Sequence, residues 1–311
     1  MKILLLGVEG QQGWHKAGNE HEFAFVDVFS ETESVANIKW FIDSRCKVYS
    51  NADEAIEDFK PDFAAINVPN FVKNDPDLEL KFIEKKIPLL IAKLRLRNKS
   101  DFDKTLAAAN KYGGEVYVGE FYRYSPGIET LKKFIADGFV GKPEQVRWEC
   151  GLAHPDVWDW ELNYENLVID DLGFHHFSIL HYLIDLTNPK LVFGLSASPE
   201  KGKPSTGSSG TVVVTNASGC NVSYCVDWHN TMRSSIDNFG CVSIDGTEGG
   251  VSLDNGKVFS MKWGSEKKEE QLIEIDAENA PEKILLGKKQ DVWTIQEFAP
   301  VVECVQKALS K

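Results

Sequence analysis

Three residues whose types together could remove the proton of an alcohol lie in two separate parts of the chain. Lys93 follows the apolar run Ile87–Ala92, and Asp171 and His175 are four residues apart in an Asp-Leu-Gly-Phe-His segment. If that segment is helical, the carboxylate and the imidazole share one face. An ammonium, a carboxylate and an imidazole are the groups needed to take a hydroxyl proton while its hydride leaves. The pattern predicts dehydrogenase chemistry.

The elements that must position Lys93 alternate in type up to about residue 121. Short apolar runs typical of buried parallel strands are separated by segments of helical spacing. The expected strands are Lys2–Leu6, Phe23–Phe29, Lys47–Tyr49, Phe63–Val68, Pro88–Ala92 and Glu115–Val118. The expected helices are Ala52–Phe59, Asp77–Lys85 and Asp101–Tyr112, with Asn51 and Ser100 as candidate N-caps. This alternation predicts a doubly wound parallel sheet of the Rossmann type.

The pattern changes after about residue 122. Helices are expected at Pro126–Gly138, Gly173–Leu186 and about Val292–Leu309. Strands joined by turn sequences are expected at Glu144–Leu152, Leu191–Ala197, Thr211–Thr215, Asn221–Trp228, Gly240–Asp245, Gly250–Asp254, Lys257–Lys262 and Gln271–Ile275. The sequence therefore predicts a dinucleotide-binding Rossmann domain at 1–121. It predicts an α+β domain with a large open, mostly antiparallel sheet at 122–311, for substrate binding and oligomerisation.

Glycines with GxxGxxG spacing, Gly7, Gly10 and Gly13, follow the first expected strand. Glycines let the backbone approach a pyrophosphate, and the N-terminus of a following helix offers N–H groups to it. Asp27, twenty residues after Gly7, lies where a carboxylate would bind the adenosine ribose, which favours NAD over NADP. Ser30 is the alternative for that place, and with Ser30 there NADP becomes possible. The simpler interpretation of the glycines is a tight turn without a ligand.

Several short motifs, taken in order, resemble the family of glucose–fructose oxidoreductase and myo-inositol dehydrogenase over nearly the whole chain. They are Val68-Pro69-Asn70, the lysine of Ala92-Lys93-Leu94, Arg123-Tyr124-Ser125-Pro126, the Gly138–Pro143 turn, Asp171–His175 and the Gly246–Gly249 turn. The resemblance implies a Rossmann domain followed by an open-sheet domain. It also implies a nicotinamide cofactor and, as substrate, a hydroxyl of a sugar, cyclitol or related polyol.

The resemblance further implies that Lys93, Asp171 and His175 form the reaction centre. His175 would be the general base in oxidation, since a free imidazole has a pKa of about 6.5. Lys93 would hydrogen-bond the reacting oxygen, and Asp171 would orient the substrate hydroxyl or the imidazole ring. Pro69 and Asn70 would lie near the nicotinamide ribose. Hydride transfer itself belongs to the cofactor.

Other interpretations compete with each of these assignments. Lys93 could be a solvated strand end, Asp171 a helix cap and His175 a core histidine. The polar and aromatic stretch from His154 to Tyr164 could bind a sugar or form a lid. Arg123 could contact the substrate or form a salt bridge between the domains. No metal site is expected, because no third ligand accompanies Asp171 and His175. A nucleotide or sugar sensor without catalysis, or a plain sugar-binding module, remains an alternative function.

Composition narrows the class of partner. The net charge is −13, from 34 basic and 47 acidic residues, which argues against nucleic acid and anionic membranes. The N-terminus lacks the pattern of a signal peptide, no run is long enough to span a membrane, and no cysteines form a CxxC pair. We expect a cytoplasmic protein. An uncovered, apolar face of the antiparallel sheet would favour a homodimer or homotetramer.

Overall fold

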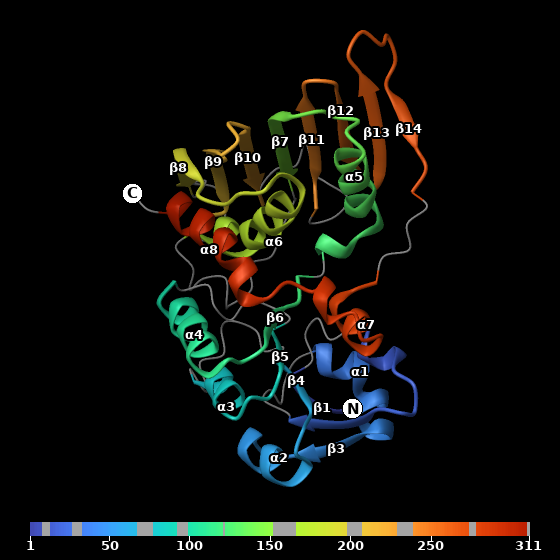
Figure 1. The fold of residues 1–311 in the computed structure, drawn as a ribbon, viewed down its shortest axis with the longest axis vertical. Coiled ribbons are helices and arrows are strands. Elements are labelled where there is room, and N and C mark those ends of the chain that lie inside the picture. Colours follow the sequence, from blue (N-terminus) through green and yellow to red (C-terminus); the bar gives the residue numbers. More distant parts are fainter. Residues whose placement is uncertain are drawn as a thin grey trace. The chain divides into compact units, whose positions relative to one another are not determined.

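The structure, a computed structural model, describes residues 1–7, 13–26, 33–66, 77–91, 99–120, 122–151, 166–197, 207–228, 239–273 and 278–309 (Figure 1). The chain divides into two compact units. The first contains Met1–Phe121 together with Glu278–Phe298, and the second contains Tyr122–Ala277 and Ala299–Lys311. The segment Glu278–Phe298, which the sequence analysis placed in the second domain, therefore packs with the first unit. The functional roles of the two units remain predictions.

The first unit is built on the predicted doubly wound sheet. Its six parallel strands are ordered β3-β2-β1-β4-β5-β6, with bounds β1 Lys2–Leu6, β2 Glu22–Val26, β3 Cys46–Tyr49, β4 Phe63–Ile66, β5 Leu89–Ile91 and β6 Val116–Val118. All residues of β4 and β5 are fully buried, as expected for strands covered on both faces. The strand order reverses between β1 and β4, the usual place for a ligand in such sheets.

Helices connect these strands. They are α1 Glu33–Arg45, α2 Ala52–Phe59, α3 Leu78–Glu84 and α4 Lys99–Tyr112. The unit also contains, from the far end of the chain, α7 Ala280–Leu285 and the 3-10 turn η4 at Lys289–Asp291. Asn51 caps α2 as predicted, because its side chain accepts the backbone N–H of Glu54 at 2.9 Å. Ser100 is not the cap of α4, which already begins at Lys99. The helix α1 was not predicted.

The connection between β1 and β2 differs from the sequence prediction. A helix was expected after the glycines, but residues 13–21 contain only η1, a single 3-10 turn at Trp14–Lys16. The physical reason is length: Ala17 already has extended backbone angles, and Gly18 begins a turn closed by the N–H of His21. Too few residues remain after Gly13 for an α-helix. The prediction of a helix N-terminus at this place is therefore wrong.

The second unit contains the predicted open sheet. Its eight strands are ordered β14-β13-β12-β11-β7-β10-β9-β8, and only β7 and β10 pair in parallel. Their bounds are β7 Pro143–Gly151, β8 Lys190–Ala197, β9 Ser209–Thr215, β10 Asn221–Asp227, β11 Cys241–Gly246, β12 Gly249–Asp254, β13 Lys257–Lys262 and β14 Glu269–Gln271. The mostly antiparallel sheet is confirmed.

Three helices cover one face of this sheet (Figure 1). They are α5 Pro126–Ala136, α6 Leu167–Ile184 and the end of α8 Ile295–Leu309; the 3-10 turn η2, Tyr122–Tyr124, precedes α5. Helix α5 contacts β12 where Gly127 meets Leu253, and α8 contacts β8 where Gly194 meets Ala308. Helix α6 begins well before Gly173, the predicted first residue.

The uncovered face of the sheet is not uniformly apolar, as the sequence analysis had assumed. Strand register places Phe193 and Leu195 of β8, 49% and 53% exposed, at one end of this face. Met261 of β13, 39% exposed, lies at the other end. The central strands present polar or small side chains, namely Arg147, Glu149, Ser223, Cys225, Ser243 and Ser252. The polar centre of this face follows from the alternation of side chains along each strand, because the apolar residues of β7, β10 and β11 face the helices.

Gly194 of β8 gives a test of how closely α8 packs. A Cβ at this position would lie 2.5 Å from the carbonyl oxygen of Ala308, so backbone would have to move. We expect Gly194→Ala to destabilise the protein by roughly 1–3 kcal/mol, measured by denaturant unfolding. The control is Ser196→Ala on the same strand and face, whose hydroxyl has no hydrogen-bond partner among the described residues; it should be neutral or slightly stabilising. Equal effects of the two changes would refute tight packing at Gly194.

Candidate functional site

Asp171 and His175 both lie within α6, so the segment that contains them is helical, as the sequence analysis required. They are one helical turn apart and share one face of the helix. Both are largely buried, at 9% and 8% exposed. A carboxylate and an imidazole held this close, with little solvent, can exchange a proton with a bound hydroxyl. Their catalytic roles remain predictions.

Tyr122, in η2 just before the second unit's first helix, contacts the imidazole of His175. The two ring centroids are 4.9 Å apart with an interplanar angle of 77°, an edge-to-face arrangement. Edge-to-face packing fixes the plane of a ring as well as its position. Tyr122 therefore orients His175, a role that sequence reasoning missed. The sequence feature that could have indicated this role is the position of Tyr122 immediately before the Arg123–Pro126 motif.

Arg123 is buried inside the second unit, at 2% exposed. Its guanidinium donates to the hydroxyl of Tyr124 and lies 4.4 Å and 5.3 Å from the ring centroids of Tyr124 and Tyr182. Desolvation by burial raises the pKa of Tyr182, whose hydroxyl donates to Glu129 of α5 at 3.0 Å. Arg123 thus joins η2 to α6 through cation–π contacts, which neither of its two predicted roles described, and Tyr182 in turn joins α6 to α5.

A second histidine, His176, anchors α6 on the sheet. Its ring stacks on Trp148 of β7 with centroids 4.5 Å apart, and its Nδ1 shares a hydrogen bond with the hydroxyl of Tyr224 of β10 at 2.9 Å. All three side chains are at most 1% exposed. Burial holds the pKa of Tyr224 well above its usual value, so the phenol stays protonated. This contact fixes the rotation of α6 and hence the direction of Asp171 and His175.

His181 has a structural role. Its Nδ1 accepts the backbone N–H of Leu186 at 2.9 Å, just beyond the end of α6.

The expected nucleotide-binding residues belong to the first unit. Gly7 and Gly13 have φ angles of +69° and +115°, which non-glycine residues rarely adopt, so the turn-forming part of their predicted role is present. The carboxyl ends of β1, β4 and β5 lie at one edge of the parallel sheet, as the register shows. Of the remaining predicted residues, Gly10, Asp27, Ser30, Pro69, Asn70 and Lys93 lie outside the described residues.

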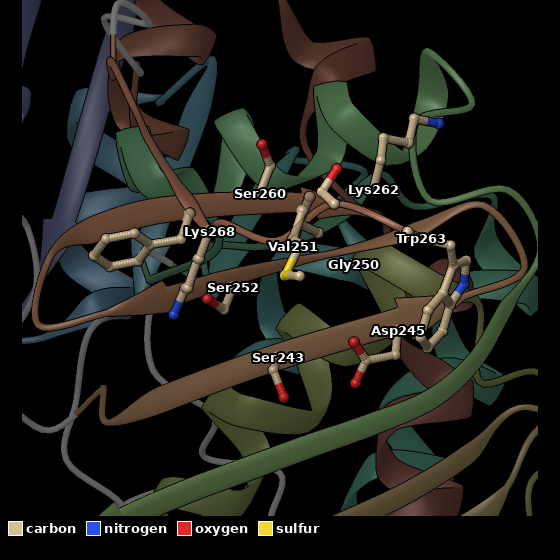
Figure 2. A pocket seen from close by; sticks show the side chains of 14 residues that line it. Ser243, Asp245, Gly250, Val251, Ser252, Ser260, Lys262, Trp263 and Lys268 are labelled. Atoms are coloured by element: carbon tan, nitrogen blue, oxygen red, sulfur yellow. The ribbon is translucent and has the colours of Figure 1, made fainter.

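A hollow of about 470 Å³ lies on the uncovered face of the eight-stranded sheet (Figure 2). Ser243, Asp245 and Ser252 line it, together with Trp263, whose indole N–H donates to the carbonyl oxygen of Gly246 at 2.6 Å. Arg147 of β7 holds Asp245 at 3.0 Å. Its neighbour Trp148 points to the opposite face, toward His176. The hollow is therefore separated from Asp171 and His175 by the sheet.

The described ranges hold no set of three His, Cys, Asp or Glu side chains arranged to bind a metal ion. Among the helices of the same ranges, none combines the length and apolar character needed to cross a membrane.

The fold is that of proteins joining a Rossmann-type unit to a helix-backed open sheet. Residues 128–252 match the model of the GFO/IDH/MocA C-terminal domain. The resemblance predicted from the sequence is confirmed, and this match places residues 128–252 with the C-terminal domains of that family.

Similar proteins have related names. An inositol 2-dehydrogenase/D-chiro-inositol 3-dehydrogenase of Halalkalibacterium halodurans is 40% identical over 70 residues, 22% of this chain and 19% of that protein. A D-apiose dehydrogenase of Paraburkholderia graminis is 27% identical over 160 residues, 50% of this chain and 41% of that protein. The matches thus span less than half the length of these relatives.

Solved structures share the fold. An aldose-aldose oxidoreductase from Caulobacter crescentus, complexed with glycerol, has a TM-score of 0.78 at 15% identity and covers 99% of this chain and 96% of its own. An oxidoreductase from Agrobacterium radiobacter, in complex with NAD+, L-tartaric acid and magnesium, has a TM-score of 0.76 at 17% identity, with 98% and 94% covered.

The hydrogen bond between His176 and Tyr224 can be removed without changing the volume of the core. We expect Tyr224→Phe to lower the free energy of unfolding by about 1 kcal/mol, because a buried hydrogen bond is lost. Tyr117→Phe is the control. The hydroxyl of Tyr117 donates to the half-exposed Glu115 at 2.8 Å, and water can replace it. Urea unfolding measures both. A Tyr224→Phe variant as stable as the wild type would show that this hydrogen bond does not hold α6 on the sheet.

Proposed function

We propose that the protein is an NAD(P)-dependent oxidoreductase that transfers a hydride between nicotinamide and a hydroxyl-bearing carbon of a sugar, cyclitol or related polyol. The observation that carries the proposal is the placement of Asp171 and His175 on one face of a buried helix whose rotation and ring orientation are fixed by His176 and Tyr122. The names of the relatives, inositol and apiose dehydrogenases, support the choice of substrate class.

In this proposal each polar group has one task. His175 takes the proton of the substrate hydroxyl in oxidation and returns it in reduction. Asp171, one turn away, orients that hydroxyl or the imidazole. Lys93, which follows β5, hydrogen-bonds the same oxygen and stabilises negative charge on it. The hydride itself is carried by the nicotinamide, and none of these three side chains transfers it.

The first unit fits a dinucleotide in two respects and departs in a third. The sheet order, with its reversal between β1 and β4, and the glycine turn at Gly7 both fit. The helix whose N-terminus would face the pyrophosphate is reduced to η1. Gly7, Gly10, Gly13, Pro69 and Asn70 would hold the cofactor. Asp27 would bind the ribose and favour NAD, and Ser30 in its place would admit NADP.

We also propose that the protein forms a homodimer, or a homotetramer built from it, through the uncovered face of the eight-stranded sheet. A twofold axis parallel to the strands maps each end of the sheet onto the opposite end of the partner. The apolar end at Phe193 and Leu195 would then cover the partner's apolar end at Met261. The polar central strands would face each other. Both exposed apolar patches are buried by one arrangement.

Replacing Lys93 tests the catalytic proposal. We expect Lys93→Ala to abolish turnover while NADH affinity stays within about tenfold, because the lysine acts on the reacting oxygen. Absorbance of reduced nicotinamide over a panel of sugars and cyclitols measures turnover, and NADH fluorescence measures binding. Lys99→Ala is the control, since Lys99 pairs with Asp103 at the surface of α4. Retained turnover in Lys93→Ala would exclude the assigned role. NADH binding by the wild type without turnover on any substrate would favour the sensor.

A single charge should disrupt the proposed dimer. We expect Leu195→Asp to shift the protein to monomers, because a carboxylate cannot be buried against Met261 of the partner without a large desolvation cost. Sedimentation velocity measures the change. Leu286→Asp, a similarly exposed leucine at the end of α7 in the first unit, is the control and should leave the assembly intact. An unchanged assembly in Leu195→Asp, or a monomeric wild type, would rule out this interface.

A further inference from the structure

The segment after the glycines is held by residues from the other end of the chain. Helix α7 packs against η1 within the first unit. Its N-cap residue, Asn279, lies where a side chain at Gly13 would be: a Cβ there would come within 2.6 Å of the Asn279 Oδ1. Lys16, the last residue of η1, forms an ion pair with Glu282 of α7.

Glu282 makes two contacts through its two carboxylate oxygens. Oε2 accepts the backbone N–H of Asn279 at 2.8 Å, and Oδ1 of Asn279 accepts the N–H of Glu282 at 3.0 Å, which completes a capping box. Oε1 accepts the ammonium of Lys16. Burial disfavours the charged form of Glu282, but the hydrogen bonds from Lys16 and Asn279 outweigh it, and the pKa of Glu282 is lowered. The carboxylate is therefore ionised at neutral pH.

A single 3-10 turn has little surface of its own with which to hold a loop. In η1 only Trp14 is buried, at 1% exposed, and its ring lies 6.1 Å from that of Phe63 on β4. A full helix would instead pack several turns on the sheet and fix the backbone that precedes it. The contact with α7 supplies a second attachment point, on the side of Gly13 and Lys16.

We propose that α7 replaces the missing helix as the anchor of the glycine segment, and that Lys16, Asn279 and Glu282 are positioning residues for the dinucleotide. This inference rests on the proposed function, since it assigns the segment from Gly7 to Gly13 to the cofactor. The bridge between Lys16 and Glu282 holds η1 and Gly13, the last glycine of that segment, in place for the cofactor. Cofactor affinity then depends on residues 266 positions apart in sequence.

A different role for Lys16 makes an opposite prediction. If its ammonium attracted the pyrophosphate directly, Glu282 would weaken binding by neutralising it. Removing the charge of Glu282 would then strengthen the binding of NADH, and removing Lys16 would weaken it. If the bridge positions the segment, both changes weaken binding.

The experiment compares Lys16→Gln, Glu282→Gln and the double variant by NADH fluorescence titration. We expect each single change to raise the dissociation constant roughly fivefold, and the double variant to be no weaker than either, because all three break the same bridge. Glu57→Gln, which breaks an exposed pair with Lys85 at 2.8 Å, is the control and should change affinity less than about twofold. Tighter binding by Glu282→Gln, additive effects, or no effect would overturn the proposal.

Hydrogen exchange of the protein without nucleotide separates this proposal from the proposed function. The N–H groups of Lys16 and Ala17 bond to the carbonyls of Gly13 and Trp14 in η1. We expect both to exchange faster in Lys16→Gln and Glu282→Gln, and to be unchanged in Glu57→Gln. If the wild type binds no NADH, the proposed cofactor is wrong, and the exchange rates still decide whether the bridge anchors η1. Unchanged rates would show that it does not.

Discussion

The contact of His176 with Trp148 and Tyr224 fixes how α6 lies on the sheet of the second unit. A helix packed on a sheet can turn about its axis unless something specific opposes the rotation, and apolar side chains alone oppose it weakly. A stacked ring and a buried hydrogen bond between α6 and two adjacent strands do so strongly, because neither survives a change in direction. The rotation of α6 fixed by these contacts then sets the direction in which Asp171 and His175 point. The residue next to the predicted base thus decides the direction of the site.

The first unit depends on a comparable long-range contact. Its sheet is an ordinary doubly wound one, yet the described part of the connection from β1 to β2, residues 13–21, forms a single 3-10 turn where such folds usually have a helix that covers β1 and caps a phosphate site. A contact with η1 comes instead from α7, in the segment Glu278–Phe298. Shortening a connection removes packing surface along with residues, and surface must come from elsewhere if a loop is to keep one conformation. Here the additional packing surface comes from a segment that follows most of the second unit in sequence but belongs to the first.

Sequence patterns predicted most strands and most helices to within a few residues, but they missed α1 and the start of α6, for physical reasons. Buried strands such as β1 and β4 are continuous apolar runs between polar turns. The first turn of helix α6, Leu167–Ile169, is a buried apolar run with no polar face, so it could not be distinguished from a strand or a loop by periodicity. The pair Asp171 and His175 was recognisable from spacing alone. Tyr122 and Tyr224 were not, because their importance comes from contacts across elements that sequence spacing does not encode. Lys93 stays a prediction.

The eight-stranded sheet must serve two purposes on its two faces, and strand β7 shows how. Trp148 points inward to hold α6, while Arg147 and Glu149 point to the uncovered face. A slip of one residue in the pairing of β7 would exchange these faces, bury two charges and expose the support of His176. The shift in register between Asp245 and Gly246, where β11 leaves β7, comes after five regular pairs, so it bends the end of the sheet without disturbing Trp148. One strand's register therefore links the direction of the proposed base to the surface proposed for self-association.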